Sequence, residues 1–141
     1  MVGGALNVAN VQITPYSDAA QAQTFEAIDM TGGNAGEDSL LNIADGTIVG
    51  PGSAGAGLVV RSNSSVNSGT VTANVHGVVI AGVAESIYRH GKSVTQTANV
   101  TIDHSACSGA AVSDGAGNGA IAIGAGNLIS GVDPRFVKRS A

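Results

Sequence analysis

The chain has 141 residues and a mass of 13.7 kDa, a size at which one domain with one hydrophobic core is expected. It is 43% hydrophobic but only 3% aromatic and 11% charged, with 21 glycines and no tryptophan, so Val, Ile and Ala must build the core. A net charge of −4 disfavours nucleic acid as a partner, because nothing draws the chain to a phosphate backbone.

The N-terminal residues lack the charged and apolar regions of a secretory signal. The longest apolar run, residues 75–84, is about half the length that a membrane helix needs. We therefore expect a soluble protein with no membrane partner. Cys107 is the single cysteine, which excludes an intramolecular disulfide and leaves its role open.

The first third of the chain gives weak structural signals. Val11 and Ile13 alternate before Pro15, which predicts a short strand or an extended N-terminal arm over residues 1–16. Residues 17–30 remain ambiguous between a helix capped by Ser17 and a strand.

A Gly/Ala-rich segment over residues 50–57 separates this region from the rest and is expected to form a flexible loop. An apolar piece at residues 39–43 precedes it and ends at the turn dipeptide Asp45-Gly46. Residues 132–141 are expected to form a C-terminal tail.

Strand-like alternation dominates from residue 58 onward. The expected strands cover residues 58–61, 69–75, 77–81, 86–89, 93–95, 98–103, 111–112 and 120–123. The turn His90-Gly91-Lys92 predicts a hairpin between two of them. Short strands at spacings of about 8 to 12 residues predict an all-β fold, a small β-barrel or β-sandwich of antiparallel strands with Gly-rich turns and extended termini.

Two pairs of residues are expected to lie in the core of this single domain. Val78 and Ile80 belong to a nearly continuous apolar run, and Val100 and Ile102 belong to an alternating one.

No catalytic constellation is expected. Asp103, His104 and Ser105 supply the three residue types of a catalytic triad, but neighbours on a strand point to opposite faces, so His104 cannot engage both. The Gly-rich turn after Asp114 lacks the following helix of a phosphate cradle and two oxygen ligands of a calcium loop. We expect neither an enzyme nor a bound cofactor.

A metal site is not expected either. His104 and Cys107 provide too few donors for a tetrahedral zinc ion, and His76 and His90 lack the spacing of a ligand pair.

From about residue 58 the chain resembles the capsid decoration (cement) proteins of tailed phages. The resemblance rests on residues 74–79 (Asn-Val-His-Gly-Val-Val), residues 91–95 (Gly-Lys-Ser-Val-Thr) and residues 100–103 (Val-Thr-Ile-Asp), followed by Gly109, Val112 and the Asp114-Gly115 turn. It implies a β-barrel or β-sandwich that forms trimers on an assembled capsid shell and reinforces it. It also implies the major capsid protein as partner, and a virion protein made in the host cytoplasm.

Scarce charge and flat Ser/Thr/Asn-rich strands are independently suited to assembly through strand edges and the chain termini. The residues expected to contact a partner are Val8, Val11, Ile13, Arg135, Phe136, Lys138 and Arg139. The alternatives are a carbohydrate-binding or other β-sandwich module and a small enzyme domain.

Overall fold

The computed structural model describes residues 4–14, 25–32, 36–52, 54–62, 69–91, 95–114 and 117–129. These residues form strands and turns, and every strand pair among them is parallel. Within the described ranges there is no helix that could cross a membrane.

The strands belong to three sheets. Sheet A contains β1 (Gly4–Ala9), β4 (Ser39–Ala44), β7 (Gly69–His76), β10 (Gln96–Asp103) and β13 (Ile121–Ile123). Sheet B contains β2 (Gln12–Ile13), β5 (Thr47–Val49), β8 (Val79–Ala81), β11 (Ala106–Cys107) and β14 (Leu128–Ile129). Sheet C contains β3 (Glu26–Thr31), β6 (Ala56–Ser62), β9 (Glu85–Gly91) and β12 (Ala110–Asp114).

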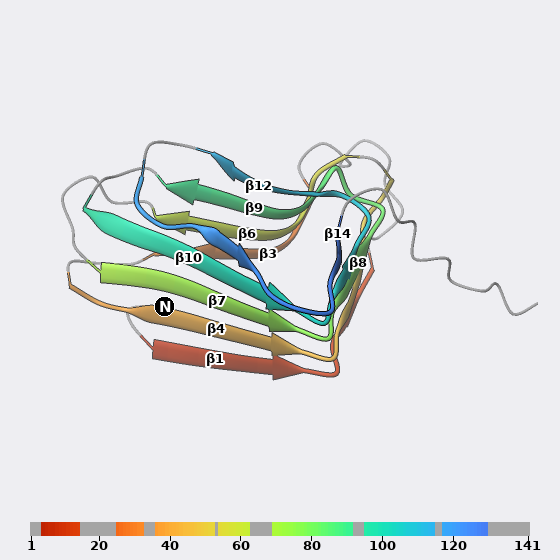
Figure 1. Cartoon of the computed structure of the whole chain (residues 1–141), viewed down its shortest axis with the longest axis horizontal. Helices are drawn as coiled ribbons and strands as arrows, with labels where there is room; N and C mark the ends of the chain where they lie inside the picture. Colours follow the sequence, from red (N-terminus) through yellow and green to blue (C-terminus); the bar gives the residue numbers. More distant parts are fainter. Residues whose placement is uncertain are drawn as a thin grey trace, which may run out of the picture.

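The chain visits the three sheets in the same order on every turn and then returns to sheet A one strand further along. Sheets A and C face each other with their strands running in opposite directions, and the short strands of sheet B close one side (Figure 1). This path is a parallel β-helix, in which each coil stacks on the preceding one.

One bend with left-handed backbone separates sheet A from sheet B in four successive coils. Asn10, Asp45, Gly77 and His104 occupy this bend with φ values of 54°, 53°, 62° and 46°. Asn, Asp, Gly and His are the residue types that tolerate this conformation best. A single residue therefore turns the chain from the long strand of sheet A into the short strand of sheet B.

The corner between sheets B and C depends on glycine. Gly50 lies beside Gly82 because Val49 and Ala81 are register partners. A Cβ atom on Gly50 would lie 2.3 Å from the carbonyl oxygen of Gly82. The stacked coils therefore approach too closely at this corner to accept a larger residue.

The core fills the space between the three sheets with aligned rows of aliphatic side chains. In sheet A, Ile43, Val75 and Ile102 are register partners, each no more than 2% exposed. Ile48 and Ile80 continue the core in sheet B, and their rows stack one coil upon the next. The outer faces of β7 and β10 stay partly or fully exposed, which produces the alternation seen in their sequences, whereas β6 is buried on both faces from Ala56 to Val60.

The prediction of antiparallel strands in a barrel or sandwich is wrong, because the sheets are all parallel. The predicted hairpin around residues 90–92 is wrong for the same reason: β9 and β10 belong to sheets C and A. The physical cause is that strands such as β7 and β10 have one exposed face and one buried face, as in an antiparallel sheet, so their alternation does not reveal their partners.

Several local predictions can be compared directly with the structure. Val78, Ile80, Val100 and Ile102 are at most 1% exposed, which confirms them as core residues. Glu26–Thr31 is strand β3, whereas residues 17–24 lie outside the described ranges.

Strands form in the segment expected to be a loop and in the segment for which a strand and an extended arm were both considered. Strand β6 begins at Ala56, inside the segment expected to be a loop, and Gly57 is buried. The segment considered as an N-terminal arm supplies β1 and β2 of the first coil. The predicted tail at residues 132–141 is outside the described residues.

Replacing Ile80 with Ala removes a fully buried side chain that stacks between Ile48 and Cys107. We expect the free energy of unfolding to fall by about 2–5 kcal/mol, the range for buried Ile-to-Ala changes. Chemical denaturation measures this loss. Thr101→Ala, on the exposed face of β10, is the control and should change stability little; equal stability of the two variants would contradict the assignment of the core.

Candidate functional site

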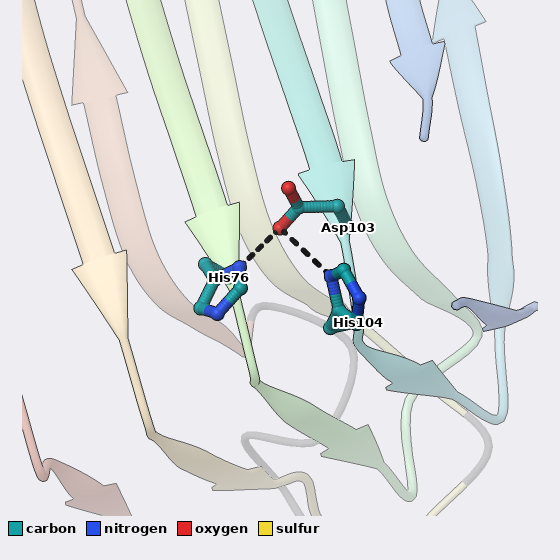
Figure 2. A group of neighbouring side chains, drawn as sticks. All are labelled: His76, Asp103 and His104. Atoms are coloured by element: carbon teal, nitrogen blue, oxygen red, sulfur yellow. Dashed lines mark hydrogen bonds and ion pairs between the residues drawn. The ribbon is translucent and has the colours of Figure 1, made fainter. Parts of the chain in front are cut away.

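Three polar side chains meet at the end of sheet A where it turns into sheet B. His76 is the last residue of β7 and Asp103 the last residue of β10, and the two are register partners. His104 follows Asp103 and occupies the bend. Figure 2 shows the carboxylate of Asp103 between the two imidazole rings.

Hydrogen bonding and stacking hold this cluster together. Nδ1 of His76 lies 2.6 Å from Oδ1 of Asp103, a hydrogen bond between the imidazole ring and the carboxyl group. Nδ1 of His104 lies 4.0 Å from the same oxygen. The ring centroids of His76 and His104 are 5.2 Å apart and tilted by 53°. We call His76, Asp103 and His104 the corner cluster.

The neighbouring coil leaves space for the ring of His104. A Cβ atom on Gly126 would lie 2.7 Å from Cδ2 of that ring, so a side chain at this position would displace the ring. The side chains of His76 and His104 are 57% and 60% exposed. The corner cluster is therefore packed on one side by the protein and open to solvent on the other.

Ser105 does not join the corner cluster as a nucleophile. Its hydroxyl donates to the carbonyl oxygen of Asp103 at 2.8 Å and accepts from the backbone N–H of Val78 at 3.1 Å. Ser105 is 3% exposed, so substrate cannot reach it. That the chain has no catalytic triad stays a prediction, but the reason given for it is wrong. His104 occupies a bend rather than a strand, and its ring lies beside the carboxylate of Asp103 on the outer surface.

The metal pairs considered from the sequence do not form. Cys107 is fully buried whereas His104 is exposed. His90 is on β9 in sheet C, stacked on Tyr88, whereas His76 is on β7 in sheet A. The structure brings His76 and Asp103 together instead, and their sequence separation of 27 residues gave no local signal.

A ladder of asparagine side chains lies on the outer face of sheet A. Asn42 donates its amide to Asn7 at 2.7 Å, and Asn74 donates to Asn42 at 2.9 Å. Thr101 is the register partner of Asn74 in the next coil, so the row continues with another polar side chain. This row of side chains is polar and uncharged, although Leu40 and Ala44 lie on the same outer face of β4.

The two ends of the coil stack expose apolar side chains. Leu6 on β1 is 45% exposed and Ile123 on β13 is 57% exposed. A small pocket at the first end lies between β1, β3 and β4, with Leu6, Met30 and Leu41 in its wall. These ends are the apolar surfaces available for contact among the described residues.

The predicted partner-binding residues divide into two groups. Val8, Val11 and Ile13 are partly buried and pack against the chain's own core. Arg135, Phe136, Lys138 and Arg139 lie outside the described residues.

Comparison with known proteins finds no matching family model, no matching curated protein and no matching solved structure.

Cys107 points into the core, and desolvation by burial raises the pKa of its thiol to about 11, an effect that a hydrogen bond with Ser86 partly offsets. The group is therefore a neutral thiol rather than a reactive thiolate at neutral pH.

This pKa shift predicts a pH-dependent loss of stability. Between pH 9.0 and about 11 the folded chain keeps a proton that the unfolded chain releases, so the contribution is complete below pH 9.0 and declines above it. The decline is at most about 1.4 kcal/mol per pH unit. Urea denaturation across this range measures it.

The variant Cys107→Ala retains every other titrating group and is the control. Its stability is expected to be lower at neutral pH because of the cavity, but to decline less steeply above pH 9.0. Parallel pH profiles for the two proteins would contradict the prediction.

Proposed function

We propose that this protein is a structural component of a larger assembly, and that it binds an assembled viral capsid shell and reinforces it. The observation that carries the proposal is the pair of apolar ends of the coil stack. The barrel or sandwich implied by the phage resemblance is not the fold, so the proposal now rests on the β-helix itself. The partners that we propose are the major capsid protein and further copies of this chain, as a trimer.

Leu6 and Ile123, exposed at the two ends of the coil stack, each align with a buried apolar side chain in the adjacent coil. Leu6 is the register partner of Leu41, which is 3% exposed. Ile123 is the register partner of Ile102, which is fully buried. Another β-strand added to either end would continue these rows and bury Leu6 or Ile123, which favours association.

Strand edges at the same ends offer backbone hydrogen bonds. Within the described residues, β1 pairs with β4 alone and β13 pairs with β10 alone. An unpaired edge is a template for strand addition by another chain. Apolar burial and backbone pairing thus coincide at each end of the stack.

The arginines of the described surface do not favour a contact with an acidic partner. Arg61 pairs with Glu26 and with Asp29 on neighbouring β3. Arg89 is 4% exposed and donates to the carbonyl oxygen of Asn118 at 3.1 Å. Both arginines of the described ranges are therefore engaged within the chain. Affinity on a shell would come from many weak contacts repeated over several copies.

Carbohydrate binding is the second candidate function, and the asparagine ladder is the observation that favours it. The amides of Asn7, Asn42 and Asn74 form a regular row on the outer face of sheet A, with a spacing set by the stacked strands. Amide and hydroxyl groups bind sugar hydroxyls. A glycan array tests this function: a signal that Asn42→Ala abolishes would replace the structural proposal.

The main test places charge at each end of the stack. Leu6→Glu and Ile123→Glu should weaken binding to empty phage shells stripped of their own decoration protein by about tenfold, equivalent to 1.4 kcal/mol. Cosedimentation measures the bound fraction. Thr101→Glu, exposed on β10, which is paired on both sides, is the matched control and should bind as the wild type does.

Binding to the shell at low and high salt distinguishes a contact held by charge from one held by apolar burial and strand pairing. Between about 0.1 M and 1 M salt the screening length falls from about 10 Å to 3 Å, which releases proteins held by charge. We expect the wild type to remain bound. Release by salt, or full binding by both end variants, would refute the proposed mode of attachment.

A further inference from the structure

We propose that the corner cluster is a binding site for a divalent transition metal of the zinc type. Two imidazoles and one carboxylate, from His76, His104 and Asp103, lie with their donor atoms within 4.8 Å of one another. Imidazole nitrogen suits zinc and its neighbours in the first transition row, whereas magnesium and calcium prefer a shell of oxygens. Two imidazole nitrogens and one carboxylate oxygen therefore favour zinc and its neighbours in the first transition row over magnesium and calcium.

The distances fit a tetrahedral ion after small side-chain movements. Bond lengths of about 2.0–2.2 Å from zinc to nitrogen or oxygen place neighbouring donor atoms roughly 3.3 Å apart. Oδ1 of Asp103 lies 2.6 Å from Nδ1 of His76 and 4.0 Å from Nδ1 of His104, so the observed separations bracket this value. Metal binding would lengthen the first separation, shorten the second and require an unprotonated nitrogen on each imidazole ring.

The backbone places the three residues next to one another before a metal arrives. His76 and Asp103 are held opposite each other by the parallel register of β7 and β10. His104 is held by its bend, whose backbone N–H donates to the carbonyl oxygen of Ala125 at 3.0 Å. Binding then requires little ordering of the chain, and the ion would connect two successive coils of the β-helix.

An open coordination position would remain on the solvent side. The side chain of Asp103 is 39% exposed and both histidines are more exposed still. Three protein ligands with an open fourth position bind water or an external donor. The site therefore suits a metal that is accessible to a second molecule rather than one enclosed by the protein.

Other coils of the chain suggest substitutions that preserve the fold. Ala44 is the register partner of His76 in the preceding coil, and Asn10 occupies the same bend as His104 in the first coil. His76→Ala and His104→Asn therefore place in the site residues that equivalent positions already accommodate. Asp103→Asn keeps the size of the side chain and removes its charge.

The test is isothermal titration of the metal-free full chain with zinc chloride, with magnesium chloride as the comparison ion. We expect one zinc ion per chain, a higher melting temperature in zinc and no response to magnesium. Each of His76→Ala, His104→Asn and Asp103→Asn should weaken zinc binding by at least about tenfold, since losing even an outer partner of a ligand costs 10–100-fold.

His90→Gln is the matched control, because it removes a histidine outside the corner cluster, and it should bind zinc as the wild type does. Thermal unfolding of each variant in the presence of a metal chelator establishes that the metal-free variant is folded. The proposal is overturned if the wild type does not bind zinc at millimolar concentration, or if the three cluster variants keep wild-type affinity. It is also overturned if His90→Gln abolishes binding to the same extent as the cluster variants.

Discussion

Backbone hydrogen bonds between successive coils hold each strand in parallel register with the strand of the same sheet in the next coil. In sheet A this register joins Asn7 to Asn42, Asn42 to Asn74, and His76 to Asp103, across 35, 32 and 27 residues of sequence. Neighbouring strands in a sheet lie about 4.8 Å apart, so aligned side chains come into contact. Core rows, bends and the corner cluster all depend on this alignment.

The core follows from the register because inward side chains stack on others of the same kind. Ile48 lies beside Ile80, and Leu58 lies beside Ile87, with all four buried. The same rows remain incomplete at the first and last coils, which leaves Leu6 and Ile123 exposed. A β-helix therefore gains stability from each added coil and leaves apolar side chains exposed at its first and last coils, the property on which the proposed assembly role depends.

The outer face of sheet A is under different constraints. Its side chains do not fill the core, so polar residues at Asn42, Asn74 and Thr101 are compatible with folding. The bend after each strand accepts a small set of residue types, and His104 is one of them. Donor groups can thus accumulate at this corner without disturbing the core, and the register determines which of them meet.

The sequence predicted the positions of many strands, but it did not predict how the strands pair. Alternation located most strands from residue 58 onward and identified Val78, Ile80, Val100 and Ile102 as core, because burial on one face acts on each strand separately. The corner cluster was missed, since His76 and Asp103 are neighbours only through strand pairing.

Even a literal repeat would not have supplied the register. Residues 72–75 and 97–100 both read Thr-Ala-Asn-Val, yet Thr97 pairs with Thr70 rather than Thr72. The separation between paired residues also shortens along the chain, so no fixed period marks the coils. The sequence by itself determined most strands from residue 58 onward and several of their core residues, because these depend on local alternation and composition. Only the tertiary structure decided parallel pairing, the meeting of His76 with Asp103 and the apolar ends, because these arise from backbone hydrogen bonds between segments about thirty residues apart.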